Sequence, residues 1–277
     1  MRRTPCGILL CALCLGLALL VPARPAQAEE FIVGGTGSAG PLVQILFDAF
    51  QKQHPGVSLK LIAPPMGTNG GLKALSQGRV HLVMVGRPLA KAELAQFGQH
   101  FDLADTPFVL ASKDGLRRSG FTLDEVAKIY EGELTRWDDG KPIRLVMRGA
   151  YESDTLLLKD MSASLSRALD VARARPGMSG AVNDLETVTL LANTPGSFGP
   201  TTLGLLKTLG VHLQLFALNG AAPTVANLKN GKYPWHKKLT VVLPLQPTPA
   251  AGSFALFLRS AKAREILLRN DYLPITP

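Results

Sequence analysis

The chain has 277 residues, of which 30 are Lys or Arg and 21 are Asp or Glu, and its formal net charge is +9. Aromatic residues are few, and the basic residues are scattered in short pairs such as Arg117-Arg118 and Lys237-Lys238. Nucleic-acid binding requires clustered positive charge with stacking surfaces, so this class is not expected. The positive excess favours small anionic ligands or anionic surfaces.

The N-terminus predicts a secretory signal peptide over residues 1–28. Arg2 and Arg3 precede an apolar run, which is followed by the small-x-small sequence Ala26-Gln27-Ala28. A membrane anchor is the alternative, but the run is shorter than the roughly 20 residues that a spanning helix needs. We therefore expect cleavage after Ala28 and a protein exported to the periplasm.

All three cysteines, Cys6, Cys11 and Cys14, lie in the predicted signal peptide. Leu13, rather than a small residue, precedes Cys14, so lipidation is not expected. The chain from Glu29 onward has no thiol, which excludes disulfides, thiolate catalysis and cysteine metal sites there. Such a chain must fold by burial of an apolar core alone.

The first half of the exported chain alternates strand and helix patterns. The expected elements are a strand at 31–33, a glycine turn, a helix at 41–54, a strand at 57–62, a helix at 71–77 and a strand at 80–85. Pro41 suits the first helical turn, where a missing N–H costs nothing. This alternation predicts an α/β fold with a mostly parallel sheet.

The second half begins with a helix from Thr122 to Tyr130, because Thr122 and Glu125 form a capping box. Further along, the patterns predict strands at 143–147, 198–200, 211–218 and 239–245, and helices at 162–175 and 254–269. Gly177 and Gly180 are expected to end the helix at 162–175. The stretch 244–252 is rich in Pro and Ala and is the nearest thing to a linker.

The turn at residues 35–40 fits the G-x-G-x-x-G spacing that binds a dinucleotide's pyrophosphate. A dinucleotide site also needs an acidic residue at the end of the next strand, and that strand ends in Ala63-Pro64-Pro65. The dinucleotide interpretation is therefore not favoured. Backbone N–H groups at a helix N-terminus, together with the Thr36 and Ser38 hydroxyls, instead predict a small anion site.

Two further segments offer the same chemistry. The turn at 67–71 carries Thr68 before a second helix, and Arg148 precedes Ser153-Asp154-Thr155 after a later strand. Arg148 can offer a bidentate fork to an oxyanion. The alternatives are ordinary turns with capping hydroxyls and a solvated loop arginine. Two such turns in one strand–helix unit of a basic exported chain favour anion capture.

The sequence does not assemble a catalytic or metal-binding constellation. Neither Ser38 nor Ser179 lies in a G-x-S-x-G nucleophile elbow, and the five histidines show no metal-binding spacing. His81 is expected to be a packed core histidine with a satisfied ring. No close acidic pair suggests glycoside chemistry. We therefore expect no enzyme activity, no cofactor and no metal.

Several segments, taken in order, resemble the phosphate-binding proteins of bacterial ABC importers. They are residues 36–41, 54–57, the Gly-Thr-Asn-Gly-Gly-Leu-Lys-Ala-Leu run at 67–75, 87–89, 122–137 and 223–234. Together they span essentially the whole exported chain, which makes the resemblance far more specific than any one loop.

The resemblance implies a type II periplasmic-binding-protein fold, in which two α/β lobes are joined by two crossing strands and close over one oxyanion. It implies lobe 1 at 29–111 and 244–277 and lobe 2 at 112–243. The ligand residues that it implies are Thr36, Gly37, Ser38, Thr68, Arg87, Arg148, Ser153, Asp154 and Thr155. A monomer that binds inorganic phosphate or a related oxyanion is expected, with an ABC permease or a membrane sensor as partner.

This chain departs from the family pattern in the third loop. Four residues rather than three separate Arg148 from Ser153, and Asp154 replaces a glycine, so the position of Arg148 is in question. Asp154 either accepts the proton of hydrogen phosphate and so rejects sulfate, or faces solvent on a remodelled loop. Gly86 offers no hydroxyl, although Arg87 is retained. The alternative function is an orphan receptor with another ligand or none, acting in signalling.

Overall fold

The computed structural model describes residues 29–113, 116–176 and 180–275. The predicted signal peptide, the three cysteines and Gly177 of the predicted helix end lie outside these residues. Within the described ranges, no helix is both long and apolar enough to cross a bilayer.

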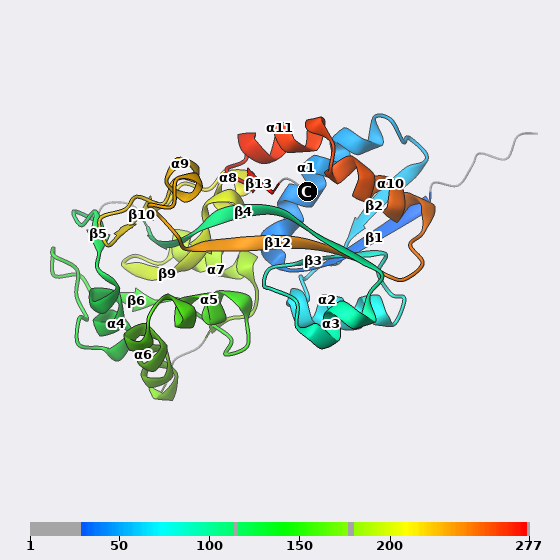
Figure 1. The fold of residues 1–277 in the computed structure, drawn as a ribbon. Helices are drawn as coiled ribbons and strands as arrows, with labels where there is room; N and C mark the ends of the chain where they lie inside the picture. The colour runs from blue at the N-terminus through cyan, green and yellow to red at the C-terminus, as the bar shows by residue number, and fades with distance from the viewer. Residues whose placement is uncertain (1–28, 114–115, 177–179, 276–277) are drawn as a thin grey trace, which may run out of the picture.

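The molecule consists of two lobes joined by two long strands, β4 (Gln99–Ser112) and β12 (His236–Leu243), which run side by side through its middle (Figure 1). β4 contributes residues to the cores of both lobes, and β12 contributes residues to the core of the first lobe. The expected crossing strands are therefore confirmed. The ranges 29–111, 112–243 and 244–277 stay a prediction, because the lobes share these strands.

The first lobe is built from the start and the end of the chain (Figure 1). Its elements are β1 (Glu29–Gly35), the short 3-10 helix η1 (Gly37–Ala39), α1 (Gly40–Gln51), β2 (Val57–Leu61), α2 (Gly67–Ser76), β3 (Leu82–Val85), α3 (Lys91–Gln96), α10 (Pro249–Leu258) and α11 (Ala261–Arg269). The last strand, β13 (Leu273–Pro274), pairs with β4.

Between the crossing strands the chain forms the second lobe and the elements that lead back from it. They are β5 (Gly120–Phe121), α4 (Leu123–Glu131), β6 (Arg144–Leu145), β7 (Met147–Arg148), α5 (Ser153–Met161), α6 (Ala163–Ala174), β8 (Gly180–Ala181), α7 (Asp184–Asn193), β9 (Ser197–Thr202), α8 (Leu203–Leu209), β10 (Gln214–Leu215), β11 (Ala217–Leu218) and α9 (Val225–Lys229).

One continuous sheet runs through both lobes in the order β2-β1-β3-β12-β4-β9-β6. In the first lobe, β1 lies parallel to β2 and β3, as the alternation of strands and helices predicted. β4 and β12 pair antiparallel with each other. β12 also pairs antiparallel with β3, and β4 with β9, so the whole sheet is mixed. The parallel strands β1 and β3 point their carboxyl ends toward the seam between the lobes.

Each lobe has its own aromatic core. In the first lobe, the amphipathic helix α1 buries Phe47 and Phe50 against Phe31 and Phe254. The core of the second lobe includes four large rings, Trp137, Phe198, Phe216 and Tyr233. Fully burying one such side chain stabilises a fold by roughly 1.5–3 kcal/mol, so two cores of this kind can hold a thiol-free chain together.

Most of the predicted elements are present, with three corrections. The helix expected at 71–77 begins at Gly67, so the second glycine turn is itself the first turn of α2. The helix expected at 254–269 is two helices, because Ser260 caps a new helix at Ala263 N. The expected linker at 244–252 contains the start of α10, which Thr248 caps.

His81 fulfils the expectation of a satisfied, packed histidine. Its Nδ1 accepts a 3.1 Å hydrogen bond from the amide of Ile32, and its ring stacks on Phe31. This leaves His81 with a structural role in the first lobe.

Candidate functional site

The glycine turn after β1 is buried at the carboxyl end of that strand. Gly35 has a φ of 118°, and a Cβ there would lie 2.0 Å from the Met84 carbonyl oxygen, so only glycine fits. The amide of Thr36 donates to the same oxygen at 2.9 Å. The hydroxyls of Thr36 and Ser38 form a 2.9 Å hydrogen bond, and both side chains are buried. The turn therefore holds two hydroxyls just before α1.

The first turn of α2 packs against this glycine turn. A Cβ on Gly71 would lie 2.8 Å from the Gly35 Cα, so the two segments are in close backbone contact. The buried Thr68 hydroxyl accepts a 3.1 Å hydrogen bond from the amide of Gly86, which directly follows β3. The ends of two parallel strands thus meet the starts of two helices, which is where open α/β sheets bind ligands.

The second lobe contributes the loop from Arg148 and the first turn of α5. Ser153, Asp154 and Thr155 open this helix, and all three side chains are buried. Arg173 of α6 donates to the Thr155 hydroxyl at 3.1 Å and to the Arg148 carbonyl at 2.8 Å. These bonds fix the loop and the helix start relative to each other.

Lys237, from the start of β12, lies fully buried among these groups. Its Nζ donates to Oδ1 of Asp154 at 2.6 Å and to Oδ1 of Asp184, the first residue of α7, at 2.8 Å. The Arg148 guanidinium lies beside the same carboxylates: Nε is 3.9 Å from Asp154 Oδ2, and Nη2 is 3.7 Å from Asp184 Oδ2. We call Lys237, Arg148, Asp154 and Asp184 the ion cluster.

Arg148 retains one donor that no described residue uses. Its Nη2 lies 3.0 Å from Glu152 Oε2, and its Nη1 donates to the Ala181 carbonyl at 3.1 Å. Its Nε is buried and has no hydrogen-bond partner within the described part of the chain. A buried donor without a partner is costly, and a guanidinium N–H is well suited to an oxyanion.

The two carboxyls of the ion cluster differ in their pKa. Burial raises the pKa of Asp154 above its usual range, and the charge of Lys237 offsets this only in part. Burial acts in the same direction on Asp184, but the charges of Lys237 and Arg148 hold its pKa below the usual range. Burial by itself lowers the pKa of Lys237, whereas the two carboxylates raise it. Asp154 is therefore the carboxyl that takes up a proton more readily.

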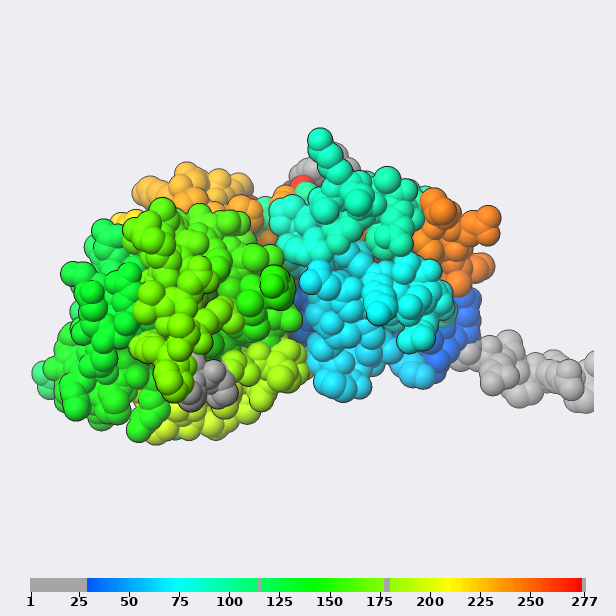
Figure 2. Space-filling view, turned by 90° about the horizontal axis from the view of Figure 1, so that it is seen from below, coloured from blue at the N-terminus to red at the C-terminus, as the bar shows by residue number. Residues whose placement is uncertain are grey.

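The two lobes meet along a narrow seam (Figure 2), and residues of both lobes approach each other closely there. A Cβ on Gly86 of the first lobe would lie 2.7 Å from Lys237 Cε and 3.4 Å from Ser153 Oγ. A Cβ on Gly37 would lie 3.0 Å from Asp184 Oδ2. These two glycines therefore allow the side chains of the second lobe and of β12 to approach the glycine turn.

Eight of the nine predicted site residues lie around this seam, and Arg87 does not join them. Its guanidinium makes two hydrogen bonds of 2.8 Å and 2.7 Å to the Glu93 carboxylate and a third of 2.7 Å to Asn69 Oδ1. These bonds hold Arg87 on the first lobe between α2 and α3.

The proposal that Asp154 faces solvent is wrong, because its side chain is 2% exposed and pairs with Lys237. Asp154 is buried because it lies in the first turn of α5, which faces the seam. Arg148, at the end of β7, is buried beside Asp154 and Asp184 despite the extra residue in the loop.

Sequence reasoning missed Lys237 and Asp184. Lys237 was placed with Lys238 as one of the scattered basic pairs, yet residue alternation along the strand puts it on the same face as the buried Leu239. Asn183 accepts a hydrogen bond from Glu186 N and so carries a capping signal that places Asp184 in a first helical turn. Neither signal reveals that the two residues meet.

A small cavity of about 30 Å³ lies beneath the glycine turn, on the side of Val33 and Leu61. This is the size of a single water site rather than of a phosphate group. A second cavity of about 420 Å³ reaches Arg148 from within the second lobe and is lined by Glu152 and Arg173 as well.

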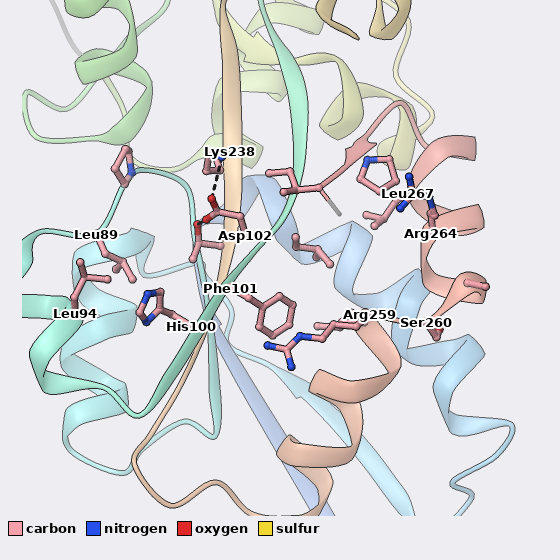
Figure 3. A pocket seen from close by; sticks show the side chains of 17 residues that line it. Leu89, Leu94, His100, Phe101, Asp102, Lys238, Arg259, Ser260, Arg264 and Leu267 are labelled. Atoms are coloured by element: carbon pink, nitrogen blue, oxygen red, sulfur yellow. Dashed lines mark hydrogen bonds and ion pairs between the residues drawn. The ribbon is translucent and has the colours of Figure 1, made fainter. Parts of the chain in front are cut away.

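Another cavity, of about 610 Å³, lies away from the seam on the other face of the crossing strands (Figure 3). Lys238 and Asp102 point toward each other there with a 2.9 Å ion pair, and Arg259 lies over the Phe101 ring at 4.0 Å. Consecutive residues of a strand face opposite sides, so Lys237 enters the seam while Lys238 lines this cavity. None of the predicted ligand residues lines it. Among the described residues, no cluster of three or more His, Cys, Asp or Glu side chains could hold a metal ion.

Solved structures of related architecture cover almost the whole chain. A phosphate ABC transporter substrate-binding protein from Clostridium perfringens, solved with bound phosphate, is 18% identical with a TM-score of 0.77, covering 90% of this chain and all of that one. An ABC-type phosphate transport receptor from Vibrio cholerae is 18% identical with a TM-score of 0.64, covering 88% and 99%. PstS from Borrelia burgdorferi is 19% identical with a TM-score of 0.54, covering 90% and 100%. At these identities the likeness shows the fold.

No curated protein matches the sequence significantly. A family model described as a PBP superfamily domain matches residues 21–262, which is most of the chain. The two lobes, the crossing strands and the interlobe seam agree with that match. The chain therefore belongs to the PBP superfamily domain family, the expected family of two-lobe binding proteins.

Proposed function

We propose that this protein is an exported receptor that captures phosphate, or a similar tetrahedral oxyanion, in the seam between its lobes. The observation that carries the proposal is the convergence at one place of hydroxyls from both lobes with the buried, partly unpaired guanidinium of Arg148. Hydroxyls, amides at helix starts and a guanidinium are the groups that replace the water of an oxyanion. The phosphate-bound relative of the same fold supports this ligand class.

In this proposal each lobe supplies one side of the ligand shell. The first lobe offers Thr36, Gly37, Ser38 and Thr68 at the starts of α1 and α2. The second lobe offers Arg148 and the first turn of α5 with Ser153, Asp154 and Thr155. An anion held between both sets stabilises the closed arrangement of the lobes, because it contacts both at once.

Asp154 gives the site a way to prefer phosphate over sulfate. Its carboxyl oxygen can accept the proton of hydrogen phosphate, whereas sulfate has no proton to donate near neutral pH. Its burial beside Arg148 and Lys237 places it where this contact can form. Delivery to an ABC permease is the role proposed for the closed form. A receptor for membrane signalling is the alternative, and no observation on this chain favours it.

The proposal is tested by calorimetric titration of the chain from Glu29, stripped of ligand by unfolding and refolding, with phosphate and with sulfate at fixed ionic strength. We expect one phosphate per chain and no displacement by sulfate. Ser38→Ala should weaken phosphate binding by about tenfold, which corresponds to about 1.4 kcal/mol, the scale of one hydrogen bond to a charged group.

Ser76→Ala is the matched control, because Ser76 is an exposed serine at the end of α2 whose hydroxyl donates to the Lys73 carbonyl. It should bind phosphate as the wild type does. The proposal fails if neither phosphate nor sulfate binds at millimolar concentration, or if both serine variants bind equally well.

A further inference from the structure

Lys237 lies where the anion-binding groups of both lobes converge. Its Cε is the atom nearest to a Cβ placed on Gly86, and Thr36 Oγ1 and Ser153 Oγ lie within 3.2 Å and 3.4 Å of the same point. The lysine therefore shares one small volume with hydroxyls from each lobe. Gly86 makes this possible, because any side chain there would meet the lysine stem.

Lys237 lies on β12, which pairs with β3 of the first lobe, and its ammonium group pairs with two carboxylates of the second lobe. Its stem lies against Gly86 of the first lobe, and its Nζ pairs with Asp154 of α5 and Asp184 of α7. All three charged side chains are buried, so water does not screen the pairs. Opening the seam must separate these charges or carry the lysine away from the first lobe.

The ion cluster is balanced by itself, with two cations and two carboxylates. Within the described ranges, the other charged side chains that contact it are the partly exposed Glu152, which pairs with Arg148, and Arg173, which donates to the Arg148 carbonyl. An oxyanion that enters beside Asp154 and Asp184 meets two negative charges already paired with Lys237. The oxyanion can pair with Lys237 only after the ion pairs between Lys237 and the two carboxylates have broken.

We propose that Lys237 is an intramolecular ligand of the interlobe site, which holds the lobes closed through Asp154 and Asp184 and must leave these carboxylates before an oxyanion binds. The inference rests on the proposed function for the identity of the competing ligand. The closing of the lobes by the lysine does not depend on that identity and can be measured separately.

Lobe closure can be measured with two spin labels, because the chain from Glu29 has no cysteine of its own. Gln77→Cys at the end of α2 and Arg167→Cys on α6 place one exposed label on each lobe (Figure 1). Without added anion, the wild type should give one short interlobe distance. Lys237→Met should give a longer and broader distribution, because it leaves two buried carboxylates that gain water when the lobes open.

A triple variant removes the lysine together with both of its carboxylate partners, Lys237→Met with Asp154→Asn and Asp184→Asn, and leaves Arg148 paired with Glu152. Its lobes should also be open without anion, and it should bind phosphate about tenfold or more tightly than the wild type, since no internal pair has to break. If Lys237→Met alone does not fold, the pair Asp154→Asn with Asp184→Asn removes the same ion pairs from the other side.

The matched control makes the same kinds of change at the neighbouring lysine and its two partners: Lys238→Met with Asp102→Asn and Asp105→Asn. Lys238 pairs with both carboxylates outside the seam, so this variant has the same net charge as the triple variant. It should keep the short interlobe distance and the phosphate affinity of the wild type.

The two readouts separate the two proposals. If the Lys237 variants keep the wild-type interlobe distance, or if the wild type binds phosphate as tightly as the triple variant, Lys237 is not an internal ligand. If phosphate binds none of the proteins, the proposed function fails, and the distance measurement still decides whether Lys237 holds the lobes closed.

Discussion

At the scale of single residues, the ion cluster is the most unusual feature of the chain. Buried charges are costly unless they are paired and hydrogen-bonded, and here Lys237 bonds two carboxylates at once. The two carboxyls are not equivalent, because Asp184 has a lowered pKa and Asp154 a raised one. Their contributions to stability therefore have opposite signs.

The ionised form of Asp184 contributes stability above the unfolded-state pKa of about 4, and this contribution is lost as the pH falls through the folded value. The raised pKa of Asp154 means that its ionised form lowers stability above its folded pKa. At pH 7, Asp184→Asn should lower the unfolding free energy by about 2–3 kcal/mol, whereas Asp154→Asn should change it by less than about 1 kcal/mol.

Urea unfolding of both variants at pH 7 and near pH 4 provides the measurement. Asp170→Asn is the control, since Asp170 forms an exposed pair with Lys159 and should change stability by no more than about 0.5 kcal/mol. A larger loss for Asp154→Asn than for Asp184→Asn at pH 7 contradicts the assignment of the two carboxyls.

The hydroxyls of the proposed anion site could be predicted because each lies in a local segment with a recognisable pattern. Thr36 and Ser38 lie between β1 and α1, as predicted, and Thr68 lies in the first turn of α2. Lys237 and Asp184 are 53 residues apart in sequence and meet only through the tertiary fold. A sequence pattern in either segment alone does not contain that contact, which is why the ion cluster could not be predicted.

At the scale of the elements, capping residues determine where several helices begin. Thr122 accepts a hydrogen bond from the Glu125 amide, and the Glu125 side chain accepts one from the Thr122 amide, as the capping box predicted. The hydroxyls of Thr248 and Ser260 accept hydrogen bonds from the Ala251 and Ala263 amides and so cap α10 and α11 without a reciprocal side chain. These two caps explain why one predicted helix is two and why a predicted linker is partly helical.

Thr122→Ala should therefore destabilise the protein by about 1 kcal/mol, because the Glu125 amide at the start of α4 loses its side-chain partner. Thermal unfolding followed by circular dichroism measures the effect. Thr189→Ala is the control, since Thr189 lies exposed within α7 and its hydroxyl only bonds the carbonyl one turn earlier. Equal changes in the two variants would show that the cap does not stabilise α4.

At the scale of the whole molecule, the crossing strands connect the two cores and place the seam between them. β4 carries buried residues into both cores and β12 into the first, and the glycine turn of the first lobe faces α5 and α7 of the second. The alternation of strands and helices predicted the α/β class, but the sequence pattern does not specify the antiparallel pairing of β12 with β3. That pairing brings Lys237 to the seam.

The central claim is that a tetrahedral oxyanion binds in this seam. Arsenate has the shape and proton chemistry of phosphate, and the anomalous scattering of arsenic locates it in a crystal of the chain soaked or grown with arsenate. The account predicts one arsenic position within hydrogen-bond reach of Ser38, Thr68 and Arg148, in the space that Lys237 Nζ has vacated. Arsenic only in the large cavity beside Arg259, or none at saturating arsenate, would contradict it.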